Sequence, residues 1–394
     1  MKSKLILLIP MLFVLTFLGC EQTEDVKNNT NQADLKSFID SVDLPYNFSI
    51  EFDPEEVKTV DSAKIYSAAY LDFDHDVVID TLLEGEVTAT ENYAEGIQYQ
   101  AETENQTEYL WIYDGGESFG IESAVNGGIS YGVHLDEDFL FSKQFTVIEN
   151  TPGPPDNITQ EYGYDLKGNY KSFVDLDFMP YEQALTEVES ILATLGFPTI
   201  EVAETYSLDL ETMTHHYDLY LEADGSKDSF NWSKEDEAYL FFFSQTIDDI
   251  PLTNKHWPSM PLTLSEAFSY TSMHVFYAGK SKIDLGANNF LERGKMISEE
   301  SLISGADALD QLIDHYSEVL LSNKTKLLSM ELSYVAIYKG NEKYELIPAW
   351  VFEVAEEYES TTFDGEEVIY FDEYEYYLVN AVTGERIMKA SDIE

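Results

Sequence analysis

Three aspartates at alternate positions, Asp72, Asp74 and Asp76, are the residues of this sequence that come closest to a metal-binding motif. Calcium-binding loops use oxygen ligands at positions 1, 3 and 5, and they also need glycine at position 6 and glutamate at position 12. These two positions hold Val77 and Leu83, so the calcium-loop interpretation fails. Read as a strand, the segment places the three aspartates on one solvent-facing side, where they could still bind Ca²⁺ or another divalent cation weakly.

The rest of the sequence carries no recognisable catalytic signature. Its seven histidines include no pair at the i, i+4 spacing of metal ligands on a helix, and His215 and His216 fall in an expected strand, where they point to opposite faces. No G-x-S-x-G segment provides a serine nucleophile. With 75 acidic residues, some pair lies at a glycosidase distance in any fold, so acidic pairs carry no information. We therefore expect no enzymatic activity, with a cell-wall hydrolase as the weaker alternative.

A second acidic segment, YFDEYEYYL at residues 370–378, mixes tyrosines with carboxylates. In a strand, alternation places Tyr374 and Tyr376 on one face and Tyr377 on the other. Tyrosines among carboxylates are typical of surfaces that recognise a peptide or a glycan, and they equally fit the half-exposed face of an ordinary sheet. Both interpretations stay open from the sequence.

The only cysteine, Cys20, ends an apolar run, Leu5–Leu18, that is preceded by Lys2 and Lys4. A basic start, an apolar stretch and a small residue at the cleavage point are the parts of a secretory signal. The run of about 14 residues is shorter than the roughly 20 residues that span a bilayer. The pair Gly19-Cys20 resembles the end of a bacterial lipoprotein signal, in which the cysteine thiol receives a diacylglycerol. We expect acyl chains such as palmitate on Cys20 to anchor the mature protein to the outer face of the cell membrane.

The chain is strongly acidic, with 75 Asp and Glu against 22 Lys and Arg and a net charge of −53. This balance excludes nucleic acid as a partner, because a phosphate backbone requires a basic surface. It also disfavours contact between the folded body and anionic lipid, so the anchor is needed for retention at the membrane. The acidity fits a binder of cations or basic peptides, and it equally fits adaptation to salt, alkaline pH or solubility.

Hydrophobic periodicity predicts a β-rich first half and a change of period in the second half. Alternating segments predict strands at about 63–82, 86–102, 107–113, 129–134 and 139–148. Helical spacing then predicts two amphipathic helices, at Tyr181–Leu195 and at about 306–321. Strands are expected after each helix, at about 200–208, 215–222, 237–247, 326–338, 344–357 and 367–380. A helix can cover the apolar face of each sheet.

The last helix-plus-strands unit contains the strand ELIPAWVF, residues 345–352, and the hairpin YYLVNAVTGE, residues 376–385. These two segments resemble PepSY-type and YycI-like extracytoplasmic modules over roughly residues 300–390, and more weakly over 180–250. The whole layout also resembles lipoproteins of low-GC Gram-positive (Firmicutes) bacteria. The resemblance implies non-enzymatic roles, such as restraining a membrane sensor kinase, inhibiting a peptidase or assisting envelope assembly.

These segments supply the candidate partner-binding residues, which are Trp350, Tyr374, Tyr376, Tyr377 and Asn380. Each motif residue also has a structural interpretation. Trp350 suits a core position between helix and sheet, and Asn380 suits a turn.

The sequence therefore predicts an α+β protein with an N-terminal antiparallel sheet followed by two helix-plus-antiparallel-sheet units. The expected organisation is a signal peptide at 1–19, a flexible tether at 20–42, a β-rich domain at 43–175, and units at 176–300 and 301–394. The expected function is binding or regulation of an envelope protein or peptide by a lipid-anchored protein. A lipoprotein that binds a divalent cation or another small ligand is the alternative.

Overall fold

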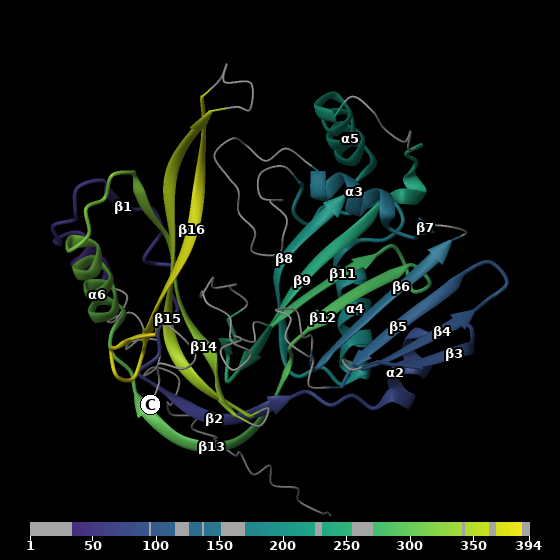
Figure 1. Ribbon diagram of the computed structural model, residues 1–394, viewed down its shortest axis with the longest axis horizontal. Helices are drawn as coiled ribbons and strands as arrows, with labels where there is room; N and C mark the ends of the chain where they lie inside the picture. The colour runs from purple at the N-terminus through teal and green to yellow at the C-terminus, as the bar shows by residue number, and fades with distance from the viewer. Residues whose placement is uncertain are drawn as a thin grey trace, which may run out of the picture.

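The computed structural model is a β-rich α+β fold with two large sheets that lie beside each other (Figure 1). The structure describes residues 34–93, 96–114, 126–135, 138–150, 170–224, 231–253, 271–340, 343–361 and 368–387. The expected signal peptide, its Cys20 and most of the expected tether lie outside these ranges. Within the described ranges, no helix has the length and apolar character needed to cross a membrane.

The smaller sheet combines strands from both ends of the chain. Its order is β1 (Phe48–Ile50), β14 (Thr325–Gly340), β15 (Lys343–Thr361), β16 (Val368–Asn380) and β17 (Arg386–Ile387). Strand β2 (Ser62–Tyr70) pairs with both β15 and β13 (Leu291–Ser301). Strand β15 is apolar on both sides, because Trp350 and Phe352 face one core while Val351 faces another. The central strands of this sheet are therefore buried on both faces.

The larger sheet is antiparallel and holds ten strands. Its order is β10 (Ile250–Pro251), β9 (Ala238–Ile247), β11 (Ser272–Tyr277), β12 (Ile283–Asn288), β6 (Gly128–Leu135), β5 (Thr107–Tyr113), β4 (Ile97–Glu102) and β3 (Glu86–Asn92). Two further strands extend it, since β8 (Ile200–Leu208) pairs with β9 and β7 (Asp138–Phe139) pairs with β6. Gly127, directly before β6, packs against Tyr70 at the end of β2, and β6 extends from there away from the smaller sheet (Figure 1).

The helices cover the two sheets unequally. Helix α6 (Gly305–Ser317) packs on the smaller sheet, and α2 (His75–Leu82) and α4 (Tyr181–Leu195) pack on one face of the larger sheet. Helices α3 (Ser142–Asn150) and α5 (Leu210–Asp224) pack on the opposite face of the larger sheet, against β8, β9 and β11 (Figure 1). No described helix packs over the outward side chains of β4, β5 and β6 on that face.

Buried polar contacts join the two sheets at the end of β9. The Gln245 side-chain amide donates to the Leu291 carbonyl at 2.6 Å, and its oxygen accepts from the Leu291 N–H at 3.1 Å. Just beyond, Asp248 accepts hydrogen bonds from Tyr66 and Lys64 of β2 and from Arg293 of β13. The sheets are therefore connected by specific side chains as well as by the chain itself.

Strong periodicity predicts the long elements well. The expected helix at 181–195 has the observed bounds of α4, and the expected strands at 107–113 and 200–208 have those of β5 and β8. The expected second helix is α6, which ends at Ser317, four residues earlier than expected. The β-rich α+β class and the largely antiparallel pairing are confirmed, with β1 and β14 as a parallel pair.

Three expected strands were wrong in whole or in part, because the residues form helices. The segment 63–82 is strand only as far as Tyr70, after which Asp74 caps α2. Residues 142–150 form α3, although Thr146, Val147 and Ile148 have high strand propensity. The segment 215–222, with His215 and His216, lies within α5. Helices α3 and α5 bury apolar side chains against the larger sheet, and this tertiary packing outweighs the local preference of their residues for a strand.

The two sheets do not follow the expected segment boundaries. Within 43–175, β1 and β2 belong to the smaller sheet, whereas β3 to β7 belong to the larger one. Strand β13, which pairs with β2, comes from the end of the segment 176–300 and was not expected.

Candidate ligand-binding site

The outward side chains of β5 form an aromatic row on the part of the larger sheet over which no described helix packs, called the uncovered part below. In the segment TEYLWIY, Leu110 and Ile112 are fully buried against α2 and α4. Alternation therefore turns Tyr109, Trp111 and Tyr113 to the opposite face. The Trp111 and Tyr113 rings lie 13° from parallel, with centroids 6.0 Å apart.

The neighbouring strand β6 supplies a floor of small residues beside this row. Ser130 pairs with Trp111 in register, and Gly132 pairs with Tyr109. A Cβ atom on Gly132 would lie 3.0 Å from Asp284 Oδ2 and 3.6 Å from the Phe139 ring. The absence of a side chain at Gly132 therefore leaves a hollow between larger side chains on both sides.

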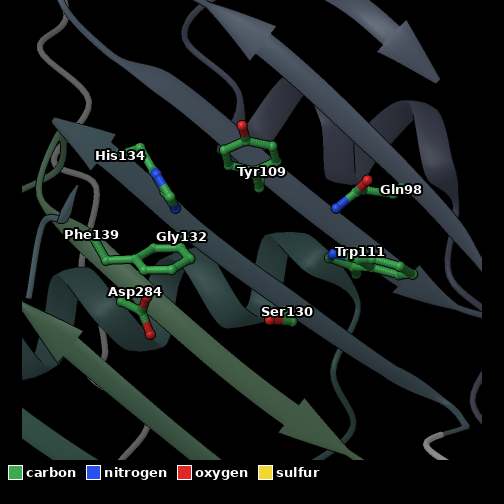
Figure 2. Close-up of a pocket in the computed structure, with 8 residues that line it drawn as sticks. All are labelled: Gln98, Tyr109, Trp111, Ser130, Gly132, His134, Phe139 and Asp284. Atoms are coloured by element: carbon green, nitrogen blue, oxygen red, sulfur yellow. The ribbon is translucent and has the colours of Figure 1, made fainter. Parts of the chain in front are cut away.

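These residues line a pocket of about 280 Å³ (Figure 2). Gln98, Tyr109 and Trp111 lie on one side of β6, Phe139 and Asp284 lie on the other side, and His134 is on β6 itself (Figure 2). The volume is close to the lower limit of ligand pockets, which run from about 300 to 1,000 Å³. The pocket therefore fits a small molecule, or one or two side chains of a larger partner.

Close aromatic contacts hold the two ends of the pocket. At one end, the Trp111 ring lies 4.7 Å from that of Tyr93. At the other end, the His134 ring lies 4.9 Å from the Tyr109 ring and 3.7 Å from the Phe139 ring, in edge-to-face arrangements. Phe139 is nevertheless 51% exposed and Tyr93 44% exposed, so each ring presents apolar surface to solvent at its end of the pocket.

A buried carboxylate fixes the strands behind the pocket. Glu108 is fully buried and accepts hydrogen bonds from the Glu84 and Gly85 N–H groups at 3.0 and 2.8 Å. It also accepts from the Tyr131 hydroxyl at 3.1 Å. Burial and the adjacent Glu108 carboxylate raise the pKa of Tyr131, which therefore stays a hydrogen-bond donor. These bonds tie β5 and β6 to the loop after α2, so the pocket floor is supported from the covered side.

Asp284 is the charged group that lines the pocket. Its side chain is 19% exposed, and its ion-pair partner among the described residues is His274, with Nε2 3.8 Å from Oδ1. The His274 ring lies over Gly286, since a Cβ there would approach Cε1 to 2.3 Å. The edge of the His274 ring also contacts Phe145 of α3, at a centroid distance of 6.2 Å. His274 therefore marks the boundary between the covered and the uncovered parts of this face.

The expected divalent-cation site has another role in the structure. Asp74 is the N-cap of α2, and its Oδ1 accepts hydrogen bonds from the N–H groups of Asp76 and Val77 at 3.1 and 3.3 Å. The segment is therefore not the strand that would align Asp72, Asp74 and Asp76 on one face. Across the described part of the chain, no three His, Cys, Asp or Glu side chains are grouped to hold a metal ion.

The five candidate partner-binding residues do not form one surface. Trp350 is 1% exposed, and its Nε1 donates to the Ile303 carbonyl at 3.3 Å in the core under α6. Tyr377 is in the same core, with Arg386 4.2 Å from its ring centre, whereas Tyr376 packs on the opposite face of the sheet.

The other two lie apart from this core. Tyr374 is half-buried, and Asn380 accepts from the Val382 and Thr383 N–H groups in the terminal turn.

The sequence-based reasoning did not identify the pocket. It predicted β5 and β6 correctly but attached no function to their outward residues, because a sequence does not show which faces of a sheet helices cover. The available signal was TEYLWIY itself, in which three large aromatic residues alternate with buried ones.

Comparison with known proteins adds evidence on the fold. No protein-family model matches the chain, and no curated protein matches it. A solved structure of an uncharacterised protein from Eubacterium rectale ATCC 33656 is similar, with a TM-score of 0.56 and 14% identity, over 90% of this chain and 98% of that chain. At this identity the similarity shows the fold alone, and the resemblance to PepSY-type and YycI-like modules stays a prediction.

Proposed function

We propose that this protein is a lipid-anchored, non-catalytic binding protein that recognises a peptide, or a segment of another envelope protein, outside the cytoplasm. The observation that supports the proposal best is the aromatic pocket on the uncovered face of the larger sheet. Aromatic side chains backed by a rigid core give a large contact area at little cost in conformational entropy, which is typical of recognition surfaces. Such a partner includes the extracytoplasmic part of a sensor kinase.

The anchor is the other half of the proposal, and it rests on the sequence around Cys20. Replacing Cys20 with alanine removes the thiol that would accept the diacylglycerol. We expect the native protein to partition into the detergent phase and the Cys20→Ala protein to be released from the membrane. Equal membrane retention of both proteins would contradict the lipid anchor and leave the binding site untouched.

The binding role is tested by comparing two aromatic truncations in the full-length protein. Trp111→Ala removes the central ring of the pocket, and Tyr46→Ala removes an 87% exposed ring before β1 as a matched control. After cross-linking on intact cells, we expect a stoichiometric partner to be lost with Trp111→Ala and retained with Tyr46→Ala. A partner retained by both variants would contradict recognition through this pocket.

A small free ligand is the second candidate, and the pocket volume of about 280 Å³ favours it. Such a ligand would be released on denaturation of the protein purified from its native membrane. Mass spectrometry of the released fraction from native and Trp111→Ala protein distinguishes this candidate from a protein partner.

A further inference from the structure

We propose that the pocket binds a positively charged group, namely the side chain of a lysine or arginine in an extracytoplasmic peptide segment. This inference deepens the proposed function and rests on it, because it names the chemical class of residue that enters the pocket. It is carried by the placement of Asp284 among aromatic rings, together with the charge of the whole molecule.

The pocket wall carries a negative charge and no fixed positive charge. Asp284 is its one carboxylate, and no lysine or arginine is among the eight described residues that line it. Within the described ranges, neither a lysine nor an arginine forms an ion pair with Asp284. Its described ion-pair partner, His274, carries a charge only when the ring is protonated, so a cation from a partner would give the Asp284 carboxylate a permanent counter-charge.

Aromatic rings line the pocket opposite this carboxylate. Trp111 and Tyr109 lie across the Gly132 floor from Asp284, and Phe139 lies beside Asp284 (Figure 2). An ammonium or guanidinium group is attracted to the face of such rings by about 0.5–2 kcal/mol, and more strongly when water is excluded. A carboxylate and aromatic faces around one hollow therefore favour an organic cation over a neutral or anionic group.

The overall charge of the protein also favours a cationic partner. A net charge of −53 creates a potential that attracts cationic segments and repels anionic ones, so it raises the association rate of a basic peptide. The pocket holds about 280 Å³, which suits the end of one long basic side chain, while the peptide backbone would lie along the exposed rings of Phe139 and Tyr93.

The experiment is calorimetric titration of the full-length lipoprotein, in neutral detergent at low salt, with three capped amino acids. The probes are the Nα-acetyl amides of arginine, lysine and glutamine, which differ in charge but share a long side chain. We expect saturable binding of the arginine and lysine probes and none of the glutamine probe. Asp284→Asn is expected to weaken the binding of the arginine probe at least about tenfold, or about 1.4 kcal/mol.

Asp310→Asn is the matched control, because it removes the same charge from an exposed position on α6. We expect its affinity to stay within about twofold of the native protein, since an exposed charge on α6, in the other sheet, interacts through water and over a long distance with a cation in the pocket. Trp111→Ala is the second pocket variant, and it keeps the test meaningful if Asp284→Asn does not fold.

The outcomes separate this inference from the proposed function. Equal binding of the arginine and glutamine probes, or no effect of Asp284→Asn, would overturn recognition of a cation. If Trp111→Ala nevertheless abolished binding of these probes, the pocket would remain the proposed binding site, and only its preference for a cation would be wrong. If a neutral chitooligosaccharide bound and none of the three probes did, both recognition of a basic side chain and recognition of a peptide partner would be wrong. If none of the three probes bound, the inference would also be wrong.

Discussion

Two aromatic strands of this protein have opposite roles in the structure, although their sequences look alike. Strand β5, TEYLWIY, lies in the larger sheet with three rings on an uncovered face, whereas β16, VIYFDEYEYYLVN, lies in the smaller sheet. Tyr376 and Tyr377 of β16 are both buried, on opposite faces, and Trp350 of the adjacent β15 is buried under α6. The comparison teaches that alternation assigns residues to faces, while the packing of distant helices decides which face stays open.

The difference follows from where the helices pack. Helix α6 and its capping Ser304 follow β13 directly and return over the smaller sheet, so Trp350 is enclosed. On the larger sheet, α3 and α5 cover β8, β9 and β11, and their coverage ends near the contact between Phe145 and His274. Aromatic residues beyond this boundary have no described helix above them. We therefore expect truncation to affect stability in the smaller sheet and binding in the larger one.

The largest expected effect is on the stability of the smaller sheet, at the buried Trp350. Trp350→Ala removes a 1% exposed indole and should lower the free energy of unfolding by about 3–5 kcal/mol, as for other buried tryptophans. Urea denaturation followed by circular dichroism measures the change. A loss below about 1 kcal/mol would mean that Trp350 is not a core residue, and the comparison would fail.

The next effect concerns the support behind the pocket. Glu108→Ala leaves the N–H groups of Glu84 and Gly85 without their buried acceptor, which should cost about 1–3 kcal/mol of unfolding free energy. The exposed Glu102→Ala on β4 is the control and should change stability by less than about 0.5 kcal/mol. Hydrogen exchange should also speed up at Glu84 and Gly85 in the first variant, and unchanged exchange would contradict this role for Glu108.

For Trp111→Ala, on the open face of the larger sheet, we expect a small loss of stability and a large loss of binding. Its ring packs against Tyr93 and Tyr113 at the surface, so the unfolding free energy should fall by only about 1 kcal/mol. Binding of the arginine probe should nevertheless weaken by about tenfold or more. If Trp111→Ala lost as much stability as Trp350→Ala and still bound the arginine probe, Trp111 would be a core residue and β5 would not be the binding strand.

A smaller effect concerns the junction of the two sheets and its response to acid. Hydrogen bonds from Tyr66 and Lys64 and the nearby Arg293 lower the pKa of Asp248. A carboxylate with a lowered pKa stabilises the fold above its unfolded pKa of about 3.9, and that contribution is lost as pH falls through the lower, folded value.

Asp248→Asn should therefore cost about 1 kcal/mol at neutral pH, a modest figure because the carboxylate is one-third exposed. The variant should also lose less stability on acidification. Parallel acid-denaturation curves for the two proteins would contradict this.

The smallest effect is expected at the edge of the smaller sheet. Burial and the neighbouring Arg386 lower the pKa of His315, so the folded state favours the neutral ring. The contribution of His315 is then fully present above pH 6.5 and is lost as pH falls through its lowered, folded pKa. His315→Gln should flatten the fall of the unfolding free energy between neutral and mildly acidic pH. Identical slopes for variant and native protein would contradict the lowered pKa.

Much of the framework could be predicted from local pattern, and the site could not. The apolar stripe of Tyr181–Leu195 and the alternation of 107–113 are strong enough to fix α4 and β5 within the chain. Helix α5 was expected as a strand because its helical stripe is weak, and its Met213 and Tyr217 are held by packing on the larger sheet.

The pocket depends on contacts that no local pattern encodes. Gly132 and Asp284 are separated by about 150 residues, and only the pairing of β6 with β12 brings them together.

The most direct test of this account is a calorimetric titration of Nα-acetyl-arginine amide into native and Trp111→Ala protein, side by side. The account predicts saturable heat with the native protein and loss of most of that affinity with the variant, while both proteins remain folded. Equal affinity in the two titrations would contradict the claim that the open aromatic face of the larger sheet is the binding site, and no binding to the native protein would contradict recognition of a basic side chain there.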